Sequence, residues 1–153
     1  PPPLPWTVLK AQVSLNFKQA GRDKVRIAGM LDLPAGWDPN GKTVLAGAGS
    51  NIVSFLLNAK GRAKVDKNAF KISRKLKKKV FLGGPVKIQF IISGDLAAGL
   101  AGNGLTNGTT LKTGKMVNLD VPMTLDNQPY LAQVPLLWKA VSGSGGKAKK
   151  LTK

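Results

Sequence analysis

Apolar and polar residues alternate along much of this chain, and this pattern constrains its fold more than any other sequence feature. The clearest instance covers residues 116–125 and 130–138, where apolar residues occupy every second position on both sides of a short turn at 126–129. Successive side chains of a β-strand point to opposite faces, so this alternation predicts a hairpin with one buried face. Pro122 and Pro135 fall at outward positions, and because each lacks a backbone N–H they predict a free edge or a bulge.

The same alternation predicts further strands at residues 12–18, 24–33, 43–47 and 51–57, through Phe70–Ser73, and through Ile88–Leu96. Gly29 falls on the inward face of its strand and predicts a bulge or a close approach of backbone. Residues 95–101 predict one helical turn, with Asp95 as its N-cap. Glu is absent while Gly and Pro number 18 and 10, which favours a β-rich protein. We therefore predict an all-β fold, an antiparallel β-sandwich (immunoglobulin-like or jelly-roll-like) of eight or nine strands.

Two stretches of the chain match each other without a gap. Leu31–Thr43 (LDLPAGWDPNGKT) and Gly94–Thr106 (GDLAAGLAGNGLT) are identical at seven of 13 positions, at a constant offset of 63 residues. A match at a fixed offset indicates internal duplication, so two pseudo-repeated halves are expected. The predicted organisation is a Pro-rich arm at 1–12, β repeats at 13–83 and 84–141, and a basic, flexible tail at 142–153.

The side chains needed by most enzymes are missing. Because the chain has no His, Cys or Glu, neither a Ser-His-Asp triad nor a zinc site of N and S ligands can form. We expect a non-enzymatic protein with no cofactor and no metal. The repeated Asp32 and Asp95, with Asn40 and Asn103, could supply oxygen ligands to Ca²⁺, but hydrogen bonds from each Asp to its own loop backbone are the favoured interpretation.

Positive charge is the strongest functional signal. The net charge is +17, and ten of the 20 residues between 60 and 79 are Lys or Arg. One interpretation is a polyanion-binding site that releases counterions, with the candidate residues Lys60, Arg62, Lys64, Arg74, Lys75, Lys77, Lys78 and Lys79. The other is a set of solvated strand faces on which Lys guards the edges against unwanted pairing. Phe70 is the only aromatic residue in the segment 60–79, and it occupies an inward position of its predicted strand. Stacking on nucleic-acid bases is therefore not expected.

The N-terminal residues predict an extended arm, because each proline fixes φ and removes a hydrogen-bond donor. The arm consists of Pro1, Pro2, Pro3, Leu4, Pro5 and Trp6, and it either docks on a neighbouring subunit or packs across its own domain. The chain opens with neither an initiator Met nor a signal-peptide core, so we expect a processed form. No apolar run approaches the length of a membrane span.

The segments LDLPAG, NGKTV, NAKGRAK, FKISRKLKK, GDLAAGL, VPMTL, VPLLW and GKAK, in this order, resemble an uncharacterised Lys/Gly/Ala-rich module of bacterial secreted proteins, of planctomycetes especially. The resemblance covers residues 13–150 and implies an exported β-sandwich without implying any chemistry. The segment TVLAGAGSN departs from its alternation, which leaves the register of the strand at 43–49 open.

Two functions follow as expectations. The first is a secreted or cell-surface structural subunit, a homo-oligomer or polymer that forms a fibre or surface layer through sheet edges and terminal arms. The alternative is a polyanion-binding module for nucleic acid or acidic polysaccharide that uses the Lys-rich segment 60–79.

Overall fold

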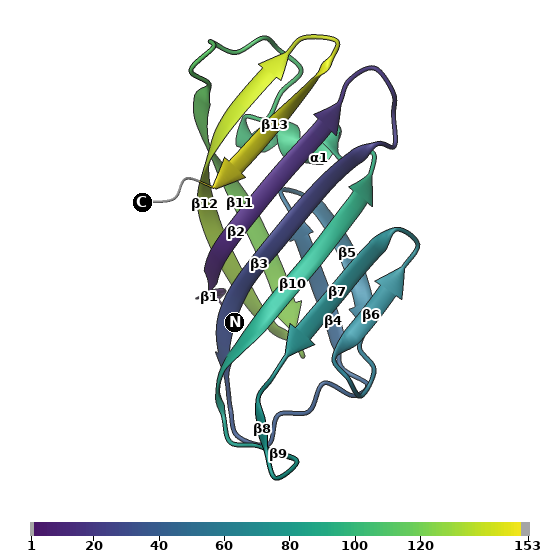
Figure 1. Ribbon diagram of the computed structural model, residues 1–153, viewed down its shortest axis with the longest axis vertical. Helices are drawn as coiled ribbons and strands as arrows, with labels where there is room; N and C mark the ends of the chain where they lie inside the picture. Colours follow the sequence, from purple (N-terminus) through teal and green to yellow (C-terminus); the bar gives the residue numbers. More distant parts are fainter. Residues whose placement is uncertain (1, 151–153) are drawn as a thin grey trace.

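The computed structural model describes residues 2–150, and it confirms the all-β class. Its strands are β1 (Leu4–Pro5), β2 (Thr7–Asn16), β3 (Asp23–Leu33), β4 (Thr43–Ala48), β5 (Asn51–Leu56), β6 (Arg62–Val65), β7 (Asn68–Ser73), β8 (Leu76–Lys77), β9 (Val80–Phe81), β10 (Gly84–Gly94), β11 (Lys115–Leu125), β12 (Gln128–Val141) and β13 (Gly145–Lys150). One helical turn, α1 (Ala97–Leu100), continues into the 3₁₀ turn η1 (Ala101–Asn103) (Figure 1).

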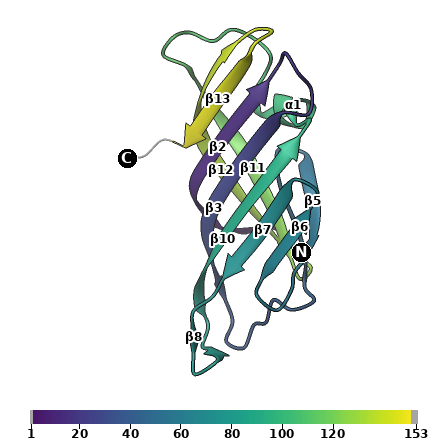
Figure 2. The same cartoon turned by 45° about the vertical axis from the view of Figure 1, so that its right-hand side comes forward.

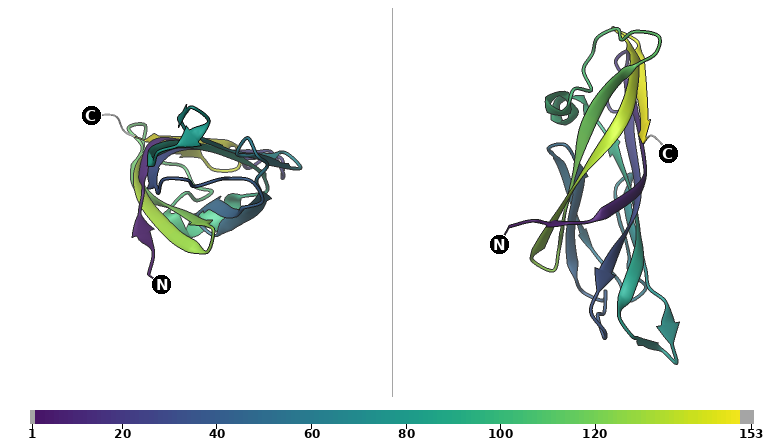
Figure 3. Two further views of the ribbon diagram at one scale, coloured as in Figure 1. Left: turned by 90° about the horizontal axis from the view of Figure 1, so that it is seen from below. Right: turned by 90° about the vertical axis from the view of Figure 1, so that its left-hand side faces the viewer.

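Eleven strands form one large sheet, in the order β5-β4-β11-β12-β13-β2-β3-β10-β7-β6, with β1 beside β12. The sheet is antiparallel except for β1, which runs parallel to β12. Seen from below, the sheet curls round on itself and is nearly barrel-shaped (Figure 3). The predicted sandwich of eight or nine strands is therefore not confirmed, because unbroken pairing from β5 to β6 leaves one coiled sheet in place of two facing ones.

The concave side of this sheet encloses a single hydrophobic core. The inward positions predicted for 24–33 are confirmed, because Val25, Ile27, Leu31 and Leu33 are all buried. Aromatic rings fill the centre: Phe70 lies 5.5 Å from Phe55 and 6.1 Å from Phe90, measured between ring centroids. Every strand with alternating apolar residues can thus bury one face while the other stays in water.

Gly29 is a position where only a hydrogen atom fits. A Cβ at this position would collide with the carbonyl oxygen of Thr7 and would lie 2.6 Å from the ring of Trp6. The register between β2 and β3 shifts here, between Val8 and Lys10, which marks a β-bulge. Both features predicted from this glycine are therefore present.

The two outward prolines of the β11–β12 hairpin lie where the sheet has no second neighbour to pair with them. On its far side β11 pairs with β4 only at Met123–Leu125, beyond Pro122. In β12, pairing with β13 begins at Leu136, one residue after Pro135. Each missing N–H therefore falls on a locally free edge, as the sequence predicts.

The first and last strands of the described residues, β1 and β13, both belong to the large sheet. Residues 145–150 form β13, which lies between β12 and β2, whereas composition predicted a flexible tail. The reason is that Ala148 faces the core and the neighbouring strands pair with the backbone on both sides. Residues 151–153 of the predicted tail and Pro1 of the predicted arm lie outside the described residues.

The predicted repeats are interleaved within the same sheet. Strand β3 of the first predicted repeat pairs along its length with β10 of the second. Helix α1 confirms the predicted helical turn, but its N-cap is Leu96 rather than Asp95, and no side chain caps it. The free N–H of Leu96 instead donates to a carboxylate oxygen of the buried Asp23, at 2.9 Å.

Candidate anion-binding face

The structure divides the predicted basic segment into two separate places. Arg62 and Lys64 lie on β6, at one edge of the large sheet, and Lys60 is exposed in the turn before it. Lys75, Lys77, Lys78 and Lys79 belong to the small β8–β9 hairpin, which projects below the large sheet (Figure 2). Sequence proximity therefore does not make these eight residues one site.

Arg74 is already engaged within the chain. Its Nη1 donates to the carbonyl oxygen of Trp37 at 2.6 Å, and its Nη2 lies 3.9 Å from a carboxylate oxygen of Asp38. The side chain is only 20% exposed and ties the 34–41 loop to the base of the hairpin. It belongs to the scaffold rather than to an open binding surface.

A larger set of cations comes together on the outer side of the sheet. The register aligns outward residues of β12, β13, β2, β3, β10, β7 and β6 in rows that cross the strands. One row runs through Lys149, Gln12, Arg26, Ile91, Ala69 and Lys64. The next runs through Lys10, Ala28, Gln89, Lys71 and Arg62.

We call this surface the basic face. It consists of ten exposed side chains: Lys10, Lys24, Arg26, Arg62, Lys64, Lys71, Lys87, Lys139, Lys147 and Lys149. The rows that contain them hold no Asp, and Asp32 comes only at the end of β3, opposite Pro85. Neither ion pair found among the described residues, Lys42–Asp126 and Arg74–Asp38, involves this face. Its ten charges are therefore available to an external anion.

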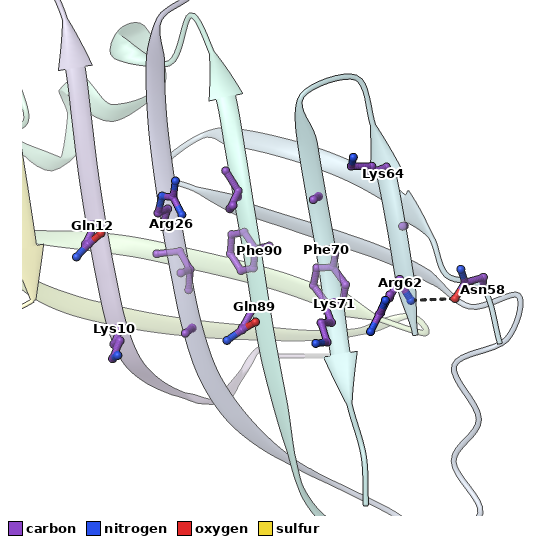
Figure 4. A pocket seen from close by; sticks show the side chains of 15 residues that line it. Lys10, Gln12, Arg26, Asn58, Arg62, Lys64, Phe70, Lys71, Gln89 and Phe90 are labelled. Atoms are coloured by element: carbon purple, nitrogen blue, oxygen red, sulfur yellow. Dashed lines mark hydrogen bonds between the residues drawn. The ribbon is translucent and has the colours of Figure 1, made fainter. Parts of the chain in front are cut away.

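The basic face is hollowed. A depression of about 850 Å³ lies over β2, β3, β10, β7 and β6, where the short side chains of Ala28 and Ala69 lie among longer ones. Figure 4 shows the side chains around it, which include Lys10, Arg26, Arg62, Lys64, Lys71 and Gln89. A second depression of about 620 Å³ shares Gln12 and Arg26 with the first and continues toward Lys24, Lys139 and Lys147. Together they form a track that crosses the strands.

Aromatic side chains do not take part in this surface. The rows that contain these ten cations hold no aromatic residue. Phe70 and Phe90 lie beneath the first depression, but each is only 2% exposed and packs into the core. Recognition here must therefore use charge and hydrogen bonds, since ring stacking has no platform.

Sequence reasoning found only Arg62 and Lys64 of this set. The other members are scattered from residue 10 to residue 149 and come together only through the strand order. The sequence did carry one signal for them: each of these cations occupies an outward position of an alternating strand. The topology that aligns them cannot be read from that signal.

The predicted arm contacts its own chain. Leu4 and Pro5 pair with Tyr130 and Leu131 of β12, and the indole Nε1 of Trp6 donates to the carbonyl oxygen of Val121 at 3.0 Å. Trp6 is buried in the core, while Pro2 and Pro3 are exposed. The arm therefore packs across its own domain, which is one of the two placements predicted from the sequence.

The duplicated carboxylates are not brought together. Asp32 lies near the end of β3, whereas Asp95 follows the last residue of β10, and these two strands run antiparallel, which puts the residues at opposite ends. No group of three or more carboxylates suited to a metal ion occurs among residues 2–150. Asn103 instead bonds to Asp120, donating from Nδ2 at 3.2 Å and accepting the Asp120 N–H at 3.1 Å.

Comparison of the chain with protein-family models, with curated proteins and with solved structures found no match. The resemblance to a secreted bacterial module therefore stays a prediction. None of the helices in the described part of the chain is long and apolar enough to cross a membrane.

Proposed function

We propose that this protein binds an acidic polysaccharide through its basic face. The observation that carries the proposal is the alignment of ten exposed, unpaired cations, nine of them along a hollowed track, with no carboxylate in the same rows. A polymer with regularly spaced sulfate or carboxylate groups would displace counterions from several cations at once. Neighbouring strands are about 4.8 Å apart and outward residues of one strand about 7 Å apart, so the cations form a dense lattice.

The polar neutral residues of the track favour a polysaccharide over a nucleic acid. Gln12, Gln89 and Asn58 line the first depression beside its cations. Their amide groups can donate to and accept from the hydroxyl groups that each sugar presents. Bases, by contrast, would find no aromatic platform on these rows. This face could still bind duplex DNA through the phosphates alone. Duplex DNA is therefore the competing ligand that the experiment must test.

The first prediction compares two variants that each lose four positive charges. The face variant carries Lys10→Gln, Arg26→Gln, Lys71→Gln and Lys149→Gln, and the hairpin variant carries Lys75→Gln, Lys77→Gln, Lys78→Gln and Lys79→Gln. We expect the face variant to lose at least tenfold in affinity for heparin or polygalacturonate, while the hairpin variant stays within threefold of the native chain. Each bound cation that is neutralised should also make the slope of log affinity against log salt less steep, because fewer counterions are released on binding.

Equal losses in the two variants would contradict the proposal, because they would show that binding depends on net charge alone. If the protein binds a short DNA duplex more tightly than the polysaccharides at the same salt concentration, the proposed ligand becomes a nucleic acid. Titration calorimetry supplies both affinities, and matched urea midpoints show that the variants are folded.

Self-assembly is a second candidate, favoured by the opposite side of the molecule. The strands β4 and β5 carry no charged residue, and Leu45, Ile52 and Leu56 are exposed on them at 39%, 48% and 67%. Strand β5 also ends the sheet, and an uncharged edge is a template for pairing with another chain. A secreted or cell-surface subunit that presents its basic face outward would use both surfaces.

This candidate is tested by particle mass. If the β4–β5 surface mediates assembly, the native chain sediments as oligomers or filaments at moderate salt, and Ile52→Lys with Leu56→Lys reduces it to monomers. A native chain that is monomeric at about 16 kDa throughout would exclude it.

A further inference from the structure

The β8–β9 hairpin stands apart from the rest of the molecule. It forms a separate two-stranded sheet and projects beyond the lower end of the large sheet (Figures 1 and 2, and the right-hand view of Figure 3). A two-stranded hairpin has little stability of its own in water. Its position must therefore be held from its base.

The base of the hairpin is firmly anchored. Phe81 is buried at 4% exposure, and its carbonyl oxygen accepts the N–H of Gly36 at 2.8 Å. On the other side, the guanidinium of Arg74 bonds to the carbonyl of Trp37. These contacts fix the direction in which the tip points, so its exposed side chains form a defined surface rather than a wandering loop.

The hairpin combines exposed aliphatic side chains with lysines. Leu76 pairs with Phe81 and shares its face, whereas Val80 and Leu82 lie on the other face. Leu76, Val80 and Leu82 are 50%, 52% and 64% exposed, although aliphatic residues of this size are usually buried. Lys75, Lys77, Lys78 and Lys79 are exposed around them, and no Asp occurs between residues 67 and 94.

The turn at the tip is made by two lysines with left-handed backbone. Lys78 and Lys79 have φ of 51° and 66°, in a two-residue turn that normally carries Asn-Gly or Asp-Gly. The β11–β12 hairpin of the same chain uses Asp126 and Asn127 in such a turn. Lysine has a conformational cost at these positions, which is consistent with selection for charge at the tip.

We propose that this hairpin docks on a lipid bilayer whose headgroups are anionic. Val80 and Leu82, which share one face of the hairpin, would enter the boundary between headgroups and acyl chains, while the lysines would lie among the phosphates and carboxylates of the headgroups. A soluble polyanion would attract the lysines but would leave Val80 and Leu82 in water, so the bilayer is the ligand that uses both kinds of side chain. This site is distinct from the basic face and does not depend on the polysaccharide proposal.

The test uses sedimentation with large vesicles of neutral phosphatidylcholine, or of phosphatidylcholine with about one third phosphatidylserine. We expect the native chain to bind the anionic vesicles and not the neutral ones. The hairpin variant should lose most of this binding, because each lysine near an anionic surface contributes about a fivefold factor. Leu76→Ser, Val80→Ser and Leu82→Ser combined should weaken binding at least tenfold with every lysine retained, whereas Ile52→Ser with Leu56→Ser should leave it unchanged.

Insertion is measured directly with a tryptophan that does not remove any charge. Leu82→Trp should be quenched by brominated acyl chains on anionic vesicles, and its emission should shift to shorter wavelength. Leu56→Trp, at a site of similar exposure on β5, is the matched control and should not respond.

Two results would overturn the docking proposal. One is the absence of quenching at position 82 while the protein is vesicle-bound. The other is loss of vesicle binding in the face variant but not in the hairpin variant, which would show that the basic face is the membrane-binding site. Polysaccharide binding is read in a separate assay, so either proposal can fail without the other.

Discussion

At the scale of single residues, the fold depends on a few positions where another residue type would not fit. Gly29 leaves room for the carbonyl of Thr7 and the ring of Trp6. The buried carboxylate of Asp23 joins the β2–β3 turn to the start of the helical turn. Alternation within its own strand was enough to predict the role of Gly29. Asp23 could not be found this way, because its partners, the N–H groups of Asn16 and Leu96, lie 7 and 73 residues away.

Gly29→Ala should destabilise the protein by about 1–3 kcal/mol, because the new methyl group must displace the Thr7 carbonyl and the Trp6 ring in a packed core. Urea unfolding measures the change. Gly108→Ala is the control, since a Cβ there meets no atom within 4 Å and the change should cost less than about 0.5 kcal/mol. Equal stabilities for the two variants would contradict the close approach at Gly29.

The single tyrosine offers a test by titration. Burial raises the pKa of Tyr130 above its ordinary value, because the phenolate loses hydration beside β1. The folded chain therefore keeps this proton to a higher pH than the unfolded chain. The contribution of Tyr130 to stability is complete below about pH 10 and is lost as the pH rises further. Tyrosinate absorbance should titrate at higher pH in native protein than in urea, and coincident curves would refute this.

At the scale of elements, the sequence predicts where the strands lie better than it predicts which strands pair with one another. The alternating segments at 24–33, 116–125 and 130–138 became β3, β11 and β12 with the expected faces inward. The flexible tail predicted from composition was wrong at β13. Gly, Ser and Lys are typical of flexible tails, and only pairing with β12 and β2 orders them here. Parity is a local property, whereas strand order depends on contacts across the whole chain.

Removal of residues 142–153 should abolish cooperative unfolding rather than merely weaken an assembly. It deletes β13 from the interior of the sheet and leaves facing edges of β12 and β2 unpaired. Circular dichroism during heating should show a broad or absent transition. The control, Lys147→Gln with Lys149→Gln, keeps the strand and its melting temperature. A truncated chain that melts like the native one would show that β13 is dispensable.

At the scale of the whole molecule, charge is sorted by side. Ten unpaired cations occupy the outer surface from β12 to β6, the uncharged strands β4 and β5 face elsewhere, and four lysines mark the projecting hairpin. The net charge of +17 predicted a polyanion as partner, and the density of Lys and Arg between residues 60 and 79 placed the predicted site in that one segment. Only two of the eight predicted residues, Arg62 and Lys64, lie on the basic face, because Lys75, Lys77, Lys78 and Lys79 belong to the separate β8–β9 hairpin.

The most direct test of the basic face is a lysine footprint. Acetylation rates at each lysine are measured by mass spectrometry, with and without a saturating acidic polysaccharide, at a salt concentration where the complex persists. We predict protection of Lys10, Lys64, Lys71, Lys147 and Lys149, with Lys75, Lys77, Lys78 and Lys79 reacting as in the free protein. Protection confined to the β8–β9 hairpin, or spread equally over every exposed lysine, would contradict binding at the basic face.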